Sequence, residues 1–273
     1  MEASGEYQYS MVKFISLYSG SDKNSSVFSY RNTNIMIDCG GSFKQLCAQL
    51  DKVDMKITDI DGIFLTHSHS DHIKALPMII KNTNIPIYAS YGTHEEIFDM
   101  GTNMPKDNRI VIYDNMPFEL NNVMIESFKT PHDTKHSIGF NLNFNEKTAT
   151  YATDVGCITE ELATNFKGND FIFLESNHDV EMLKNSQRPY NIKQRILGNK
   201  GHLSNEVSAE FSSSLAKQGL KRIMLGHLSG EANTPELAYR VTEKSYLSND
   251  IKPNKDIVLK IAPRGELSDM VEF

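Results

Sequence analysis

The chain has 273 residues, of which 39% are hydrophobic and 23% charged, and its formal net charge is −7. No apolar stretch approaches the ~20 residues needed to cross a bilayer, and the acidic balance argues against a protein that coats nucleic acid without specificity. The three cysteines are odd in number and lack CxxC spacing, which disfavours a disulfide framework and favours a reducing cytoplasm.

Short apolar runs alternate with amphipathic segments along the chain, which predicts one mixed α/β domain over residues 11–273. The polar opening, residues 1–10, is expected to be a tail outside the fold. Turns are expected at SGSDKNS and RNT, between the first three strands. The expected strands are 12–18, 26–30, 34–38, 61–66, 85–90, 109–113, 123–129, 137–144, 147–153, 170–176, 221–226 and 256–262.

Helices are expected between these strands. One has Phe43, Leu46, Cys47, Leu50 and Val53 on its apolar face, and a second includes Ala75, Leu76, Ile79 and Ile80. Thr93 and Glu96 have the spacing of a capping box at the start of a short helix. Two later helices are expected from about Ser204 to Gly219, and from the N-cap Thr234 to about Tyr246.

Five of the predicted strands run directly into a histidine or an aspartate. These residues are His67, His132, Asp154, His178 and His227. Sheets of α/β proteins bind their ligands just beyond the carboxyl ends of the strands. One such residue would normally be an ordinary polar loop side chain, but five of them indicate a shared site.

The stretch THSHSDH, residues 66–72, is the densest part of this pattern. His67 and His69 are two residues apart, so in an extended segment their side chains lie on the same side and can bind one cation. Asp71 and His72 begin the next helix and can reach a second cation nearby. Imidazole nitrogens with carboxylate oxygens suit Zn²⁺, and are also acceptable to Mn²⁺ or Fe²⁺.

These motifs resemble the metallo-β-lactamase superfamily, whose signature H-x-H-x-D-H matches residues 67–72. The segments SLYSGSDKNSS, TPHD, LESNHD, GHLSN and GHLSGEANTPELA resemble more narrowly its YycJ (WalJ) branch. The resemblance implies an α/β (α+β) fold, a four-layer αββα sandwich, with two divalent metal ions at its edge. It implies that the first ion is held by His67, His69 and His132, the second by Asp71, His72 and His227, and that Asp154 bridges them.

Two such ions would lower the pKa of a water held between them, and Asp71 could orient that water. Superfamily members with diiron redox chemistry typically carry glutamate at the position of His69, so this histidine favours hydrolysis. His178 is our candidate for the proton donor or a phosphate contact, with a non-catalytic histidine as the alternative. His202 and Ser204 could bind a phosphate before a helix, although Ser204 could equally be a helix cap. Glu175 is either a support for the site or a strand-end carboxylate.

The segment from Met182 to Gly201 is basic and contains no acidic residue. Basic groups with an aromatic ring among them form the usual binding surface for single-stranded nucleic acid. The alternative is an ordinary solvated helix and loop. The residues we expect to contact substrate are Lys184, Arg188, Tyr190, Lys193 and Arg195.

The first functional hypothesis is therefore a metal-dependent nuclease acting on single-stranded DNA, and also on RNA, and the resemblance implies 5′-to-3′ exonuclease polarity. The second is a metal-dependent hydrolase of a small ester, thioester, lactone or cyclic nucleotide, for which the basic segment would be incidental. The third is a non-catalytic binding module. The complete ligand set argues against the third.

Overall fold

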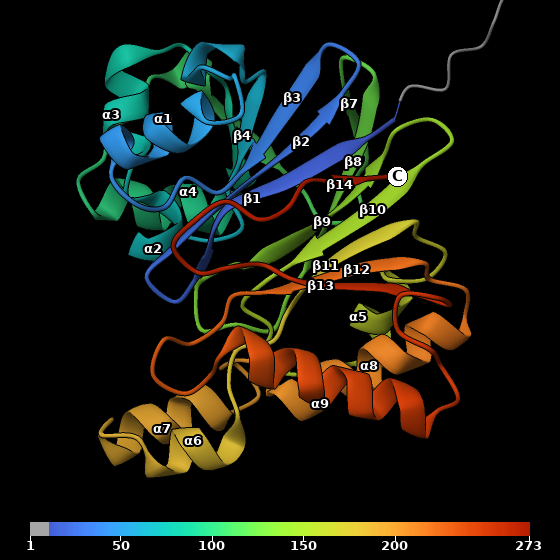
Figure 1. Ribbon diagram of the computed structural model, residues 1–273. Helices are drawn as coiled ribbons and strands as arrows, with labels where there is room; N and C mark the ends of the chain where they lie inside the picture. The colour runs from blue at the N-terminus through green and yellow to red at the C-terminus, as the bar shows by residue number, and fades with distance from the viewer. Residues whose placement is uncertain (1–10) are drawn as a thin grey trace, which may run out of the picture.

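The computed structural model describes residues 11–273, and the expected tail at residues 1–10 lies outside the described part. Over these residues two seven-stranded sheets pack face to face (Figure 1). The first sheet has the order β14 (Val271–Glu272), β1 (Lys13–Gly20), β2 (Lys23–Tyr30), β3 (Thr33–Ile37), β4 (Gly62–Phe64), β5 (Ile87–Ser90), β6 (Arg109–Ile112). The second has the order β13 (Val258–Ile261), β12 (Arg222–Gly226), β11 (Phe171–Glu175), β10 (Thr148–Ala152), β9 (Ile138–Asn143), β8 (Val123–Lys129), β7 (Phe118–Leu120).

Helices cover the outer face of each sheet, so the predicted four-layer αββα sandwich is confirmed (Figure 1). The first sheet is covered by α1 (Phe43–Asp51), α2 (Ser70–Ile73), α3 (Leu76–Asn82) and α4 (Tyr91–Asp99), with two 3₁₀ turns at Ile57–Asp59 and Lys106–Asn108. The second is covered by α5 (Glu160–Thr164), α8 (Asn205–Lys217) and α9 (Pro235–Ser248). Two further helices, α6 (Val180–Asn185) and α7 (Tyr190–Leu197), form a small lobe at the lower left of Figure 1.

The central core lies between the sheets and is rich in aromatic residues. Strand β11 illustrates why the run FIFL, residues 171–174, is apolar throughout: Phe171 and Phe173 face the central core, whereas Ile172 and Leu174 face the helices of the outer layer. Successive strand residues point to opposite faces, so a strand buried on both sides shows no alternation. Each fully buried side chain of this size contributes roughly 1.5–3 kcal/mol.

Strands β3 to β6 run parallel, as do β10 to β13. Their carboxyl ends therefore meet at the same edge of the sandwich. The loops after β4, β10, β11 and β12 are among those that the sequence marked with histidine or aspartate. The fifth follows β8, which runs in the same direction as β10 because each is antiparallel to β9. No helix within residues 11–273 is long and apolar enough to span a membrane.

Two local predictions were wrong. The expected turn SGSDKNS is largely strand, because β1 extends to Gly20 and β2 begins at Lys23. Helix α4 is capped by Ser90, whose hydroxyl accepts a hydrogen bond from the Thr93 amide at 3.1 Å, rather than by a Thr93–Glu96 capping box. Glu96 instead accepts a hydrogen bond from Ser68, in the loop of the histidine cluster.

Candidate metal centre

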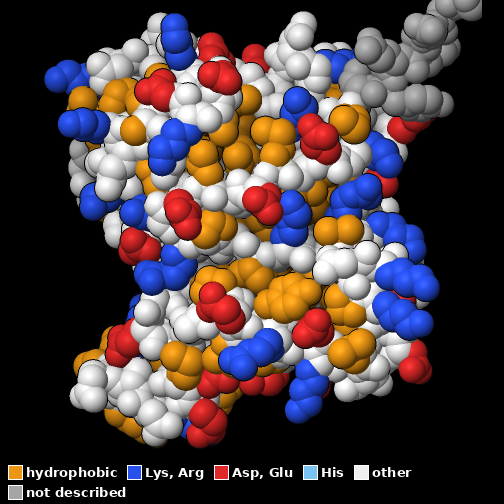
Figure 2. Space-filling model, in the orientation of Figure 1, with side chains coloured by type: hydrophobic (Ala, Val, Ile, Leu, Met, Phe, Trp, Pro, Cys, Tyr) orange, Lys and Arg blue, Asp and Glu red, His pale blue; other side chains and the backbone are white. Residues whose placement is uncertain are grey.

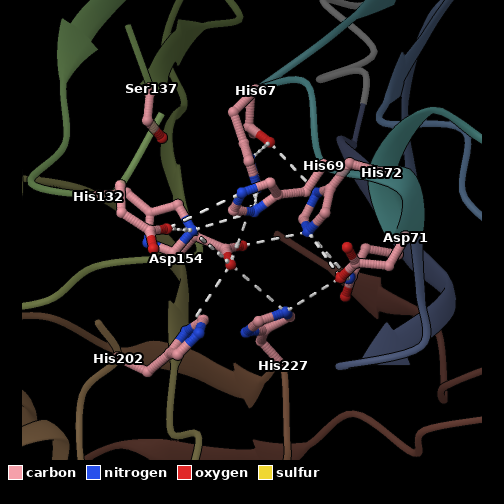
Figure 3. A network of polar contacts seen from close by, with 12 residues as sticks. His67, His69, Asp71, His72, His132, Ser137, Asp154, His202 and His227 are labelled. Carbon is pink, nitrogen blue, oxygen red and sulfur yellow. Dashed lines mark hydrogen bonds and ion pairs between the residues drawn. The ribbon is translucent and has the colours of Figure 1, made fainter. Parts of the chain in front are cut away.

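The seven predicted ligands converge at the edge where the strands end. His67 follows β4, His132 follows β8, Asp154 follows β10 and His227 follows β12. In Figure 3 these four side chains and those of His69, Asp71 and His72 point toward one centre. Three overlapping sets of side chains each offer ligand atoms within 4.8 Å of one another: His67, His69, His132 and Asp154; Asp71, His72 and His227; and Asp154, Glu175, His202 and His227.

The first group consists of His67, His69 and His132. The Nδ1 atom of His69 lies 3.0 Å from Nε2 of His67 and 3.3 Å from Nε2 of His132. Burial lowers the pKa of all three imidazoles, well below the usual value for His67, so at neutral pH they are uncharged. Three neutral imidazoles with converging nitrogens are the donor set of a cation rather than of a hydrogen-bond network.

The second group consists of Asp71, His72 and His227. The Oδ2 atom of Asp71 lies 3.3 Å from Nε2 of His72 and 3.8 Å from Nε2 of His227. Although burial opposes a charge on both histidines, Asp38 and Asp71 raise the pKa of His72 well above its usual value. Asp154 and Asp71 likewise raise the pKa of His227 to about 10. The carboxylates around the second group therefore make the electrostatic potential there more negative than at the first group.

Asp154 lies between the two groups. Its Oδ2 atom is 3.2 Å from Nε2 of His72, and its Oδ1 atom is 3.5 Å from Nε2 of His132 and 3.6 Å from Nε2 of His227. Burial opposes its ionisation, but His227, His72 and His67 hold the pKa of Asp154 well below its usual range. A single ionised carboxylate thus contacts ligand atoms of both groups.

The donor atoms of the centre fit a divalent cation. Asp154 Oδ2 and His227 Nε2 are buried and have no hydrogen-bond partner among the described residues. A buried polar atom without a partner is costly, and a carboxylate oxygen and a deprotonated imidazole nitrogen facing the same space can both be satisfied by one cation. Nitrogen and carboxylate oxygen donors in this arrangement suit Zn²⁺, Mn²⁺ and Fe²⁺.

Buried carboxylates hold the two histidines of the second group. His72 Nδ1 lies 2.7 Å from Asp38 Oδ2, and His227 Nδ1 lies 2.6 Å from Glu175 Oε1. Glu175 also accepts a hydrogen bond from His202 Nδ1 at 2.8 Å. Both carboxylates are completely buried. Such partners fix the ring orientation and raise the basicity of the ligand nitrogen.

Neutral partners hold the histidines of the first group. His67 Nδ1 lies 3.0 Å from the Thr66 hydroxyl, and His132 Nδ1 lies 3.1 Å from the Gly201 carbonyl. Besides Asp154, the carboxylate of Asp133 approaches this group, with Oδ1 3.3 Å from His132 Nε2. Its side chain is 28% exposed, so solvent weakens its effect.

Three non-glycine residues at this edge have left-handed backbone conformations. The φ angles are 60° at Asp38, 55° at Asp154 and 56° at His227. Such angles cost free energy and persist where the surroundings enforce them. The sequence analysis missed Asp38 as a member of the site, although it ends the predicted strand 34–38 and the strand-end rule applied to it as well.

A cavity of about 250 Å³ opens beside the centre. Its walls combine ligand atoms, two arginines and an apolar side. The lining residues are Ser21, His69, Ser70, Asp71, Asp154, Asn177, Arg188, Ile192, Arg195, Ile196, His202, His227 and Ser229. His202 is therefore on the wall of the cavity, whereas Lys184, Tyr190, Lys193 and Ser204 are not.

His178 does not reach this cavity. It is 1% exposed and neither ring nitrogen has a hydrogen-bond partner among residues 11–273, and burial lowers its pKa to about 4. This position away from the cavity wall fits its alternative role as a non-catalytic histidine. Ser204 caps α8 by accepting a hydrogen bond from the Val207 amide at 3.3 Å, which was its alternative role.

The basic segment forms the α6–α7 lobe, and its positive charges are largely paired. Lys184 lies 2.8 Å from Glu181, Arg188 lies 3.0 Å from Glu231, and Arg195 Nη2 lies 3.0 Å from Asp133 Oδ1. In Figure 2 basic and acidic side chains are interspersed over much of the face shown. Of the five residues of this segment that we expect to contact substrate, Arg188 and Arg195 line the cavity.

Comparison with known proteins agrees with this geometry. Residues 33–228 match the family model described as "Beta-lactamase superfamily domain". The chain is 32% identical over 227 residues to exodeoxyribonuclease YycJ of Bacillus anthracis, covering 83% of this chain and 86% of that protein. It is 31% identical over 233 residues to exodeoxyribonuclease WalJ of Streptococcus pneumoniae, covering 83% of this chain and 85% of the relative.

The fold is also shared with solved structures. The metallo-beta-lactamase fold protein YhfI from Bacillus subtilis superimposes with a TM-score of 0.70 at 15% sequence identity, covering 96% of this chain and 99% of that one. At this identity the likeness concerns the fold alone.

Proposed function

Because the chain belongs to the beta-lactamase superfamily, in the branch that contains YycJ and WalJ, we propose that it is a metal-dependent nuclease. Its proposed activity is that of a 5′-to-3′ exonuclease on single-stranded DNA, with RNA as a further substrate. The observation that carries the proposal is a cavity whose wall includes four of the seven convergent candidate ligands, His69, Asp71, Asp154 and His227, together with two arginines. The relatives named above are exodeoxyribonucleases, which supports the same reaction class.

The proposed centre holds two divalent ions, Zn²⁺ or Mn²⁺, with Fe²⁺ also compatible. His67, His69 and His132 would hold one, Asp71, His72 and His227 the other, and Asp154 both. When bound, the ions would activate a water and neutralise the charge that develops on the phosphate. Asp71 is ionised, because His72 and His227 hold its pKa well below the usual range against the effect of burial. Its carboxylate can therefore accept a hydrogen bond from the attacking water and orient it.

His202 is the proposed proton donor to the leaving sugar oxygen. Its Nδ1 atom is bound by Glu175 at 2.8 Å, which leaves Nε2 as the nitrogen available to a substrate in the cavity. Glu175 accepts hydrogen bonds from the Val155 and Leu203 amides as well, both at 3.0 Å, so its carboxylate is held in place. A fixed carboxylate can orient the imidazole in both its protonated and neutral forms.

The remaining walls of the cavity suit a nucleotide. Arg188 and Arg195 offer planar guanidinium groups to phosphate oxygens, and each is oriented by a carboxylate. Ile192 and Ile196 offer an apolar surface to a sugar or base. A cytoplasmic location completes the proposal, supported by the three free cysteines.

A gel assay tests the proposal. Single- and double-stranded DNA and RNA oligonucleotides, labelled at either end, are offered with Zn²⁺, Mn²⁺ or Mg²⁺. We expect stepwise release from the 5′ end of single-stranded DNA, and its loss in Asp71→Ala. Hydrolysis of small esters or thioesters without any cleavage of nucleic acid would favour the small-molecule hydrolase instead. Full activity in Asp71→Ala would contradict the metal mechanism.

The role of the arginines is tested by a matched pair on α7. Arg195→Ala should raise KM for single-stranded DNA about 10-fold or more, because a charge-assisted contact to phosphate is lost. Lys193→Ala, whose ammonium group bonds the Lys184 carbonyl at 2.6 Å outside the cavity, should change KM less than about threefold. Equal effects of the two changes would indicate general charge attraction rather than a contact in the cavity.

A further inference from the structure

Asn24, in the hairpin between β1 and β2, is a buried polar residue to which the proposed mechanism assigns no role. It is 1% exposed and lies at the start of β2, in the segment SGSDKNSS. This hairpin lies beside α2, the short helix that begins with the Asp71 and His72 ligands (Figure 1).

The orientation of the Asn24 amide is determined by one residue, Gly20. The Gly20 N–H donates to Asn24 Oδ1 at 3.1 Å, and Asn24 Nδ2 donates to the Gly20 carbonyl at 2.9 Å. Because one atom accepts and the other donates, exchanging the two would break both bonds. Asn24 Nδ2 is therefore a donor, and one of its two hydrogens is left for another partner.

That remaining hydrogen points at the second ligand group. Asn24 Nδ2 lies 3.1 Å from Asp71 Oδ2 and 3.0 Å from His72 Nε2. Asp71 Oδ2 is an ionised acceptor, so it makes a charge-assisted bond with the amide. The same oxygen, Oδ2, is the one that lies 3.3 Å from His72 Nε2 and 3.8 Å from His227 Nε2.

The backbone around Asn24 is locked against the same helix. The Gly40 N–H donates to the Asn24 carbonyl at 2.8 Å, and the Cys39 N–H donates to the His72 carbonyl at 2.7 Å. A Cβ at Gly40 would lie 1.9 Å from the Asp71 carbonyl oxygen and 2.5 Å from the Asn24 nitrogen. The hairpin, the loop after β3 and the start of α2 are thus in direct contact, so Asn24 cannot move without moving Asp71.

We infer that Asn24 is a positioning residue for the second ligand group, holding Asp71 Oδ2 beside the ligand nitrogen of His72. The bonds to Gly20 would suffice to hold the hairpin, and the third bond, to Asp71, is not needed for it. The inference rests on the proposed metal centre but not on the proposed substrate.

The test measures Zn²⁺ binding to the full chain by calorimetric titration, with bound ions located by anomalous scattering in crystals. Asn24→Asp keeps the acceptor for the Gly20 N–H but loses both donors and places a negative charge beside Asp71. Asn24→Ala loses donors and acceptor without adding charge. Both variants should lower the affinity for Zn²⁺ at the second group at least 10-fold, which is the size typical of losing a partner that holds a metal ligand. The affinity at the first group should stay unchanged. Asn145→Asp, an exposed change in the turn between β9 and β10, is the matched control.

Unchanged binding of both ions in the two variants would overturn the inference. Tighter binding by Asn24→Asp would also overturn it, because the new carboxylate would then be acting as a ligand. Thermal melting of the metal-free variants separates the positioning role from a folding defect, and if Asn24→Ala does not fold, Asn24→Asp decides. Because the readout is metal binding, a failure of the nuclease assay leaves this result interpretable, and the reverse also holds.

Discussion

The two ligand groups of the centre contain similar side chains but are held in different ways. His67 and His132, in the first group, bond a hydroxyl and a backbone carbonyl through their outer nitrogens. His72 and His227, in the second group, bond the buried carboxylates of Asp38 and Glu175. The surroundings of the histidines, in addition to the aspartate ligand of the second group, therefore distinguish the two halves of the site.

This difference has a consequence for metal affinity. A carboxylate on the outer nitrogen makes imidazole a stronger ligand and stabilises the positive charge that it shares with a cation. A hydroxyl or carbonyl does so less. We therefore expect the second group to bind its ion more tightly, so that a chelator removes the ion of the first group before that of the second.

Asp154→Asn should have the largest effect, because this carboxylate contacts both groups. We expect the affinity for both ions to fall by roughly 100-fold or more, because the change removes a charged ligand shared by both groups rather than a partner of a ligand. Zinc titration measures the effect, and Asp170→Asn, which removes a carboxylate that pairs with Lys147 away from the centre, is the control. Loss of only one ion would mean that Asp154 belongs to a single group.

Asp38→Asn should lower the affinity for the ion at the second group by about 10- to 100-fold, and the affinity at the first group by less than about threefold. Asparagine tolerates the left-handed backbone at this position, so the change removes charge without adding strain. Asp54→Asn, at an exposed position with a similar φ of 56°, is the matched control in the same titration. Equal weakening of both ions would erase the distinction between the groups.

Asp133→Asn should have the smallest effect, and on the first group alone. Its Oδ1 atom is 3.3 Å from His132 Nε2 and 3.8 Å from His69 Nε2, but the side chain is partly exposed and also paired with Arg195. We expect the affinity for the ion at the first group to fall only a few-fold, because solvent screens the charge of Asp133. Asp107→Asn serves as the exposed control. A larger loss of affinity at the second group than at the first would contradict the assignment of Asp133 to the first group.

Much of the fold was predictable because its signals are local. Strand β8 has the predicted boundaries, and α8 and α9 begin at the predicted caps Ser204 and Thr234. The cap of α4 was not predictable in this way. Thr93 and Glu96 have the right spacing, but Glu96 is drawn to Ser68 and Ser90 takes the cap, and these bonds depend on tertiary packing.

The functional assignment of the basic segment shows the same limit. The run from Lys184 to Arg195 is basic in sequence, yet Arg188 and Arg195 find their acidic partners 43 and 62 residues away, at Glu231 and Asp133. The sequence shows which residues are charged, but it does not show which acidic residue each arginine pairs with. Only the packing of α7 against the loop after β8 decides which of them line the cavity.

By itself the sequence determined the donors of the centre and the edge of the fold that carries them, because ligand spacing and strand ends are properties of a few consecutive residues. The tertiary structure alone decided what surrounds each donor: Asn24 meets Asp71 across 47 positions, and Glu175 meets His227 across 52. Such contacts form only when the hairpin and strands of two sheets pack together, so no local pattern records them. Short sequence motifs specify the candidate ligands, whereas long-range packing specifies the different partners that hold them in the two halves of the centre.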